Sequence, residues 1–281
     1  MKKVKWVKAI IMVFVVCCVL GMSKEVAFAK SVYESESNDT KEEAEEIEVN
    51  KQNAVNAANG KSSTLYHVSG SVSKQDEDWF KVYLSKGKQY VSVSGDSLDI
   101  EVWSEDGTLI LKKSYLGIKS GFTAYSFEIS RENYYYVRLS SSSYHSSYTI
   151  SVGEPNYSAA WCRVTLDPVT ITTKQKSIEF DLSNEDVLPE GAIVHTILMS
   201  GLNSQSVNAI SVKNVSTGMK TSLRTYSWSQ NKLESLNMLL KSRWILTFSR
   251  KENVTFTPTV TLYYVYPITS ETVNTEIILS K

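Results

Sequence analysis

The sequence predicts an all-β protein built from two modules: an N-terminal antiparallel, jelly-roll-like β-sandwich and a second mainly-β domain with one short helix. Three observations lead to this fold class. The 281 residues include 16 tyrosines and only 5 prolines, a mix that favours strands. Runs of alternating apolar and polar residues, typical of half-buried strands, recur in both halves. The length suits about two domains.

The first 29 residues have the layout of a secretory signal peptide. Lysines at positions 2, 3, 5 and 8 precede an apolar stretch over 9–20, and Ala27-Phe28-Ala29 supplies the small residues before a cleavage site. The apolar stretch is shorter than the roughly 20 residues that a membrane span needs. We therefore expect cleavage after Ala29 and a secreted, extracellular or cell-surface protein without a membrane span.

Removing this segment changes the charge and the cysteine content. It takes away five lysines and one glutamate, so 30 positive and 30 negative side chains become 25 and 29. Without a basic excess, nucleic acid is not an expected partner. Cys162 is then the only cysteine, which excludes an internal disulfide. A buried, inert thiol is favoured over a nucleophile, because free cysteines are usually buried.

A break between the modules is expected at Gly153-Glu154-Pro155-Asn156, where turn-forming residues meet. The net charge changes there from −6 over residues 30–155 to +2 over residues 156–281. We expect a first module over 30–153, a linker over 154–159 and a second module over 160–281.

The first module opens with an acidic segment and continues as strands. Asp39 and Glu42 fit a capping box, which predicts a short helix with Ala44 and Ile47 on its apolar face. Alternating runs then follow at regular spacing, as in an antiparallel sandwich. They cover residues 65–68, 79–84, 90–93, 100–103, 125–129, 135–139 and 148–152.

The order of motifs in this module resembles a known family. The motifs are Glu36-Ser37-Asn38-Asp39-Thr40, Val68-Ser69-Gly70-Ser71-Val72, Asp76-Glu77-Asp78-Trp79-Phe80, Tyr134-Tyr135-Tyr136-Val137 and Tyr148-Thr149-Ile150. Over residues 31–153 the chain is similar to the bacterial pre-peptidase C-terminal domain, which is related to the collagen-binding modules of clostridial collagenases. The resemblance implies a β-sandwich attached to an exported protein. The family usually has a glycine before the Tyr-Tyr-Val strand, where this chain has Asn133.

Acidic side chains gather at two places in the module. Ca²⁺ takes six to eight oxygen ligands, and an extended stretch followed by a loop could supply them if the fold brings both together. In the collagen-binding relatives, matching acidic positions hold calcium, so the resemblance implies the same role here. The candidate ligands are Glu34, Glu36, Asn38, Asp39, Asp76 and Asp78, with Ser71 as a weak addition. The alternative is that Asp39 only caps a helix and the other acids are solvated.

The second module resembles no family that we recognise. Its alternating runs cover residues 163–166, 177–182, 193–198, 209–212, 244–248, 260–266 and 275–279. A capping box at Ser227 and Gln230, followed by leucines at helical spacing, predicts its helix. The aromatic residues Tyr263, Tyr264, Tyr266, Trp228 and Trp244 could line a sugar- or peptide-binding face. Core and cross-strand packing is the favoured interpretation.

The sequence offers little for catalysis. It contains neither a His-Glu-x-x-His zinc motif nor a Gly-x-Ser-x-Gly elbow. We therefore expect a secreted, non-catalytic binding protein, stabilised by calcium, that attaches to an extracellular protein or polysaccharide polymer. The alternatives are a peptidase-type hydrolase with its active site in residues 160–281, which would depend on His195, and a purely structural spacer.

Overall fold

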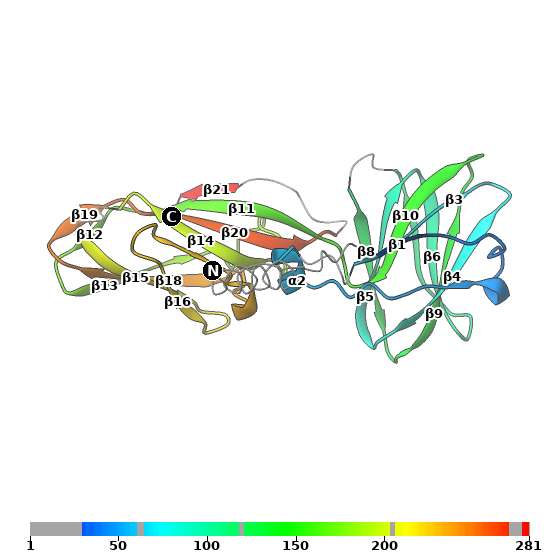
Figure 1. The fold of residues 1–281 in the computed structure, drawn as a ribbon, viewed down its shortest axis with the longest axis horizontal. Helices are drawn as coiled ribbons and strands as arrows, with labels where there is room; N and C mark the ends of the chain where they lie inside the picture. Colours follow the sequence, from blue (N-terminus) through cyan, green and yellow to red (C-terminus); the bar gives the residue numbers. More distant parts are fainter. Residues whose placement is uncertain (1–29, 61–64, 118–120, 203–205, 270–276, 281) are drawn as a thin grey trace, which may run out of the picture.

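The computed structural model describes residues 30–60, 65–117, 121–202, 206–269 and 277–280. The predicted signal peptide lies outside these residues, as do the first two residues of the last predicted strand. Two β-sandwiches lie end to end along the long axis of the molecule, with a short helix between them (Figure 1). The all-β, multi-domain fold class is therefore confirmed.

The first sandwich packs two five-stranded sheets with the orders β1-β3-β10-β5-β8 and β2-β4-β9-β6-β7. Their strands are β1 (Lys30–Tyr33), β2 (Glu45–Glu46), β3 (Tyr66–Val72), β4 (Glu77–Leu84), β5 (Gly87–Gly95), β6 (Leu98–Ser104), β7 (Leu109–Tyr115), β8 (Thr123–Ile129), β9 (Asn133–Ser140) and β10 (Ser146–Gly153). Most pairs are antiparallel. The two N-terminal strands differ from the expectation, since β1 runs parallel to β3 and β2 runs parallel to β4.

The period of two along each strand separates core from surface. In β4, for example, Phe80, Val82 and Leu84 are completely buried, whereas Tyr83 between them is about half exposed. Burial of each such side chain contributes roughly 1.5–3 kcal/mol relative to leaving it in water. Inward-facing residues from both sheets form one continuous core for this sandwich.

The second sandwich has its own core and its own sheets. Their orders are β17-β14-β20-β11-β21 and β13-β18-β15-β16, with β12 and β19 as a separate pair. The strands are β11 (Tyr157–Thr165), β12 (Val169–Ile171), β13 (Gln175–Asp181), β14 (Ile193–Ser200), β15 (Val207–Asn214), β16 (Lys220–Ser222), β17 (Ser229–Asn231), β18 (Arg243–Arg250), β19 (Val254–Phe256), β20 (Thr259–Pro267) and β21 (Ile277–Ser280).

Most aromatic residues of the second module serve its core. Trp244 is completely buried and stacks on Phe180 at a centroid distance of 6.4 Å. Tyr264 and Tyr266 are buried beside each other, and Trp228 is buried as well. The packing interpretation is confirmed for these residues. Tyr263 differs from them, because it is only half-buried.

Cys162 is completely buried in the same core. This confirms the interpretation of an inert thiol. Burial raises the pKa of the Cys162 thiol to about 12, so the nucleophilic thiolate is not populated at neutral pH.

Both predicted helices are shorter than expected. In the first module, η1 (Lys41–Glu43) is one 3₁₀ turn. Thr40 is its N-cap, and Thr40 Oγ1 donates to Glu43 Oε2 at 3.0 Å. The prediction that Asp39 caps this helix was wrong, because the helix begins two residues after it.

The predicted helix of the second module was also mostly wrong. Only η2 (Glu234–Leu236) forms, and β17 occupies the expected helix start. Lys232 and Asn237 on either side of η2 have φ values of +60° and +48°. Left-handed residues interrupt a right-handed helix, and they let Leu233 and Leu240 enter the core from separate segments.

A helix that the sequence analysis missed connects the two sandwiches. The helix α2 (Ala54–Ala58) begins at Asn53, whose side chain accepts a hydrogen bond from the backbone N–H of Asn56 at 2.9 Å. It lies between the sandwiches (Figure 1) and contacts β11, β20 and η2 of the second one. The chain therefore reaches the second sandwich and returns to β3 before the main linker.

The segment before α2 is hydrogen-bonded to the end of the first sandwich and to the linker. The backbone N–H of Asn50 donates to the carbonyl oxygen of Val152, and Asn50 Nδ2 donates to that of Glu154, both at 2.7 Å. Asn50 is completely buried. These bonds hold the segment before α2 against the end of β10.

Candidate metal centre

The two acidic clusters of the first module lie together in the structure. Glu34 follows β1 in one sheet, and Asp78 belongs to β4 in the other. The Tyr148 hydroxyl from β10 donates to Asp78 Oδ2 at 2.7 Å and also contacts the Glu34 carboxylate. The site therefore lies where the two sheets approach each other.

Strand register places Asp78 in the interior. Asp78 occupies the same face of β4 as Phe80 and Val82, and it is only 1% exposed. A carboxylate at a core-facing position is costly unless it is paired. Its side chain accepts a hydrogen bond from Tyr148 and also contacts the carboxyl group of Glu34, but no basic residue pairs with it in the described part of the chain.

Glu34 is positioned by β3. Its backbone N–H continues the pairing of β1 by donating to the carbonyl oxygen of Ser69 at 3.0 Å, and its Oε1 accepts from the backbone N–H of Ser71 at 2.7 Å. A Cβ atom on Gly70 would overlap the Glu34 carboxyl group. Gly70 thus leaves the space that the carboxylate fills, beside a hollow of about 410 Å³ that Tyr33 and Glu36 also line.

The loop after Glu34 contributes an unpaired oxygen. Ser37 has a φ of +85°, and this turn brings Asn38 inward until it is 1% exposed. The carbonyl oxygen of Asn38 accepts from the backbone N–H of Trp79 at 2.9 Å. Its side-chain Oδ1 is buried and accepts no hydrogen bond from any described residue. Such an atom costs about 1–3 kcal/mol.

Repulsion between like charges is strong here. Burial, followed by the proximity of Glu34 and Asp76, raises the pKa of Asp78 to about 8. Burial and the neighbouring carboxylates of Asp39 and Glu36 raise the pKa of Asp76. In the described part of the chain, no lysine or arginine forms an ion pair with any of these acids.

All six predicted ligands therefore belong to one region of the sandwich, with Ser71 beside it through its backbone. Glu36 and Asp39 are exposed, Glu34 and Asp76 are half-buried, and Asn38 and Asp78 are buried. Across the described residues, no three carboxylate, imidazole or thiolate groups already stand at metal-binding geometry. The donors are all oxygens, and one neutral oxygen is unpaired, which fits a hard cation such as Ca²⁺.

Two residues of the site escaped the sequence analysis. Tyr148 was recognised only as the start of a strand, and Gly70 only as part of a motif. Alternation in β10 places Tyr148 on the same face as the buried Ile150 and Val152. That pattern marks Tyr148 as internal, but nothing in the sequence indicates that its hydroxyl reaches two carboxylates.

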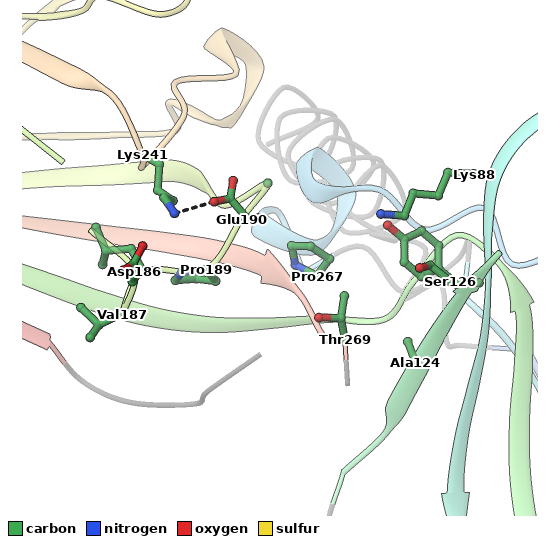
Figure 2. Close-up of a pocket in the computed structure, with 13 residues that line it drawn as sticks. Lys88, Ala124, Ser126, Asp186, Val187, Pro189, Glu190, Lys241, Pro267 and Thr269 are labelled. Carbon is green, nitrogen blue, oxygen red and sulfur yellow. Dashed lines mark hydrogen bonds and ion pairs between the residues drawn. The ribbon is translucent and has the colours of Figure 1, made fainter. Parts of the chain in front are cut away.

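A separate cleft of about 620 Å³ lies between the sandwiches. Figure 2 shows Lys88 and Ser126 on the wall formed by the first sandwich, and Glu190 paired with Lys241 on the opposite wall. The polar groups at this cleft are exposed or already paired. The cleft therefore lacks the buried, unpaired groups that characterise the acidic site.

The histidines do not form a catalytic group in the described residues. His67 packs on Phe122 at a centroid distance of 4.8 Å, with its Nε2 3.5 Å from Asn156 Oδ1. His145 is exposed, with its Nε2 3.0 Å from Ser147 Oγ. His195 lies in a different pocket, about 470 Å³ in volume, in the second sandwich.

Comparisons with known proteins concern the fold alone. A candidate secreted protein from Eubacterium rectale has 13% identity and a TM-score of 0.48, over 86% of this chain and 88% of its own. The pre-peptidase C-terminal domain of a Bacillus anthracis collagenase has 14% identity and a TM-score of 0.28, over 39% of this chain and 93% of its own. No family model and no curated protein matches the sequence.

The described residues contain no helix that is both long enough and apolar enough to cross a membrane.

Proposed function

We propose that this chain is a secreted, non-catalytic binding protein whose first sandwich is a calcium-stabilised module of the pre-peptidase C-terminal type. In this proposal the protein attaches to an extracellular protein or polysaccharide polymer. The leader pattern supports export. With one remaining cysteine, an exported chain has no internal disulfide, so core packing or bound ions must stabilise it.

One observation carries the calcium proposal. Five carboxylates and the unpaired Oδ1 of Asn38 lie in one region without a basic partner. The ion would be held by oxygens from Glu34, Asn38 and Asp78, with Glu36, Asp39 and Asp76 at its exposed side. Bound calcium supplies positive charge, and it would join the loop after β1 to the start of β4.

The decisive experiment is thermal unfolding of the full chain, without its leader, in calcium and in chelator. Calcium at about a hundred times its dissociation constant adds roughly 2.7 kcal/mol to the free energy of unfolding. For a domain of this size, the melting temperature then rises on the order of 10 °C. The Asp78→Asn variant should lose this rise. It should also be more stable than the wild type in chelator, because it removes the cost of keeping a buried carboxyl group protonated beside other acids.

Asp167→Asn is the matched control, since Asp167 is exposed in the second sandwich. It should retain the full calcium response. Two outcomes would contradict the proposal: a melting temperature that does not respond to calcium, or an Asp78→Asn variant that responds as the wild type does. Either result would mean that the acidic residues do not form a calcium site.

The raised pKa of Asp78 predicts a pH dependence in chelator. The native state keeps this proton up to about pH 8, whereas an unfolded aspartate releases it near pH 4. The native state therefore binds more protons between these values, and the free energy of unfolding should fall as the pH rises through them. Denaturant unfolding at pH 5, 6, 7 and 8 measures this fall.

Subtracting the curve of Asp78→Asn isolates the contribution of Asp78 from that of other groups. The difference between the two proteins should grow in favour of the variant as the pH rises. A difference that is constant over this range would contradict the prediction. Saturating calcium should flatten the wild-type curve.

A further inference from the structure

A second pocket lies where α2 meets the second sandwich. We call it the α2 pocket; its volume is about 470 Å³, and it is lined by Ala58, Asn59, His195, Asn231, Glu234 and Tyr263. This volume falls in the range of small-molecule sites. The walls come from both modules, because α2 precedes β3 in the chain whereas the other residues belong to β14, β17, η2 and β20.

Several backbone irregularities converge on this pocket. The pairing of β14 with β20 shifts between Val194 and Thr196, so His195 is the extra residue of a β-bulge. Its carbonyl oxygen accepts from the backbone N–H of Leu233 at 3.0 Å. Lys232 and Asn237 adopt left-handed conformations on either side of η2. Bulges often redirect a side chain next to a functional site, and strained residues cluster at such sites.

Glu234 is the most unusual group in the α2 pocket. It is only 7% exposed, yet its carboxylate forms no hydrogen bond or ion pair with any described residue. Its carboxylate oxygens therefore remain available to accept hydrogen bonds from a ligand in the pocket. The charge of Glu234 acts on His195, which lines the same pocket. Burial lowers the pKa of the His195 imidazole, so the ring is neutral at pH 7. The pocket is therefore lined by the Glu234 carboxylate, which accepts hydrogen bonds, and by the neutral His195 imidazole, which can both donate and accept them.

The other residues that line the pocket can also form hydrogen bonds with the hydroxyl groups of a ligand. The Asn231 amide both donates and accepts hydrogen bonds, and the half-buried Tyr263 supplies an aromatic surface with a polar tip. The charges of Glu234 and Lys232 oppose each other, so the pocket has no net preference for an anion or a cation. A neutral ligand with several hydroxyl groups and one apolar face matches this set.

We propose that the α2 pocket binds one sugar residue of a neutral glycan, with Glu234 and Asn231 on its hydroxyl groups. This deepens the proposed function, because it specifies the polymer class and the place of attachment. It does not depend on calcium, since the acidic site belongs to the first sandwich.

The test uses the full chain without its leader. Saturation-transfer NMR with glucose, galactose, mannose and N-acetylglucosamine detects binding, and titration of their oligosaccharides gives the affinity. We expect binding of at least one neutral sugar and no comparable binding of acidic oligogalacturonate or cationic chitosan oligomers. Glu234→Gln and Asn231→Ala should each weaken binding at least tenfold. Because Asn231 is exposed, the second variant should remain folded.

Glu190→Gln is the matched control, because it makes the same change at the cleft between the sandwiches. It should bind the sugar as the wild type does. The inference is overturned if none of the neutral sugars binds, if only the charged oligomers bind, or if Glu190→Gln loses binding as Glu234→Gln does. Glu234→Gln should keep the calcium-dependent rise in melting temperature, so failure of one proposal is distinguishable from failure of the other.

Discussion

Replacing Trp244 by alanine should unfold the second sandwich at a temperature at which the first remains folded. Trp244 is completely buried, stacks on Phe180 and donates from its indole nitrogen to the carbonyl oxygen of Leu240 at 3.2 Å. Removing such a side chain costs about 3–5 kcal/mol, because it removes contacts and leaves a cavity. This is a large part of the 5–15 kcal/mol typical of a domain.

Calorimetry is the measurement that checks this expectation. The transition of the second sandwich should move down by on the order of 10 °C or more, whereas the transition of the first should keep its response to calcium. Trp161→Ala is a suitable control, since Trp161 is half-buried on β11 and its loss should cost less. If both sandwiches unfolded in one transition at the lower temperature, the prediction that they unfold independently would be wrong.

The strands were predictable because alternation along a half-buried strand is a local property. Tyr135, Val137 and Leu139, for example, all face the core of the first sandwich, as the pattern indicated. The helices were less predictable because tertiary contacts decide them. The leucines at helical spacing in the second module are divided: Leu233 is the N-cap of η2, Leu236 ends this single turn, and Leu240 follows in a loop. Helix propensity and the spacing of the leucines do not indicate that tertiary contacts divide the segment in this way.

The acidic site was predictable in its composition, whereas its surroundings were not. The six oxygen-bearing residues are visible in the sequence as two short clusters. Their convergence requires β1 to pair in parallel with β3, which no local pattern indicates. Tyr148 comes from β10, over a hundred residues after Glu34. Gly70 contributes because the absence of a side chain leaves space for the Glu34 carboxyl group. Sequence spacing carries no information about either contact.

The α2 pocket illustrates the same limit. The sequence analysis noted Tyr263 as part of a possible sugar- or peptide-binding face and His195 as the residue on which a hydrolase would depend, but it did not place the two residues together. The β-bulge at His195 shifts it out of the simple alternation. Glu234 drew no attention, because its burial depends on η2 and on a helix from the other module. A site assembled from both modules has no signature in either one.

Tyr148→Phe should produce the largest change at the acidic site. The Tyr148 hydroxyl donates to Asp78 and contacts Glu34, so it is the one described side chain that links these two acids. Hydrogen bonds to charged groups contribute about 1.5–3 kcal/mol. In chelator, the variant should therefore lose about this much stability, because the acidic groups of Glu34 and Asp78 then lie together without the hydrogen bond from the Tyr148 hydroxyl. Chemical denaturation of both proteins in chelator measures the loss.

Calcium should compensate for part of that loss, since a cation can balance the charges that the hydroxyl no longer contacts. The rise in stability on adding calcium should thus be larger for Tyr148→Phe than for the wild type. Tyr135→Phe is the matched control. Tyr135 is buried in the same sandwich and donates to the carbonyl oxygen of Arg131 at 2.8 Å, away from the acids. It should lose stability by a similar amount in calcium and in chelator. An equal loss in both conditions for Tyr148→Phe would show that its hydroxyl serves packing alone.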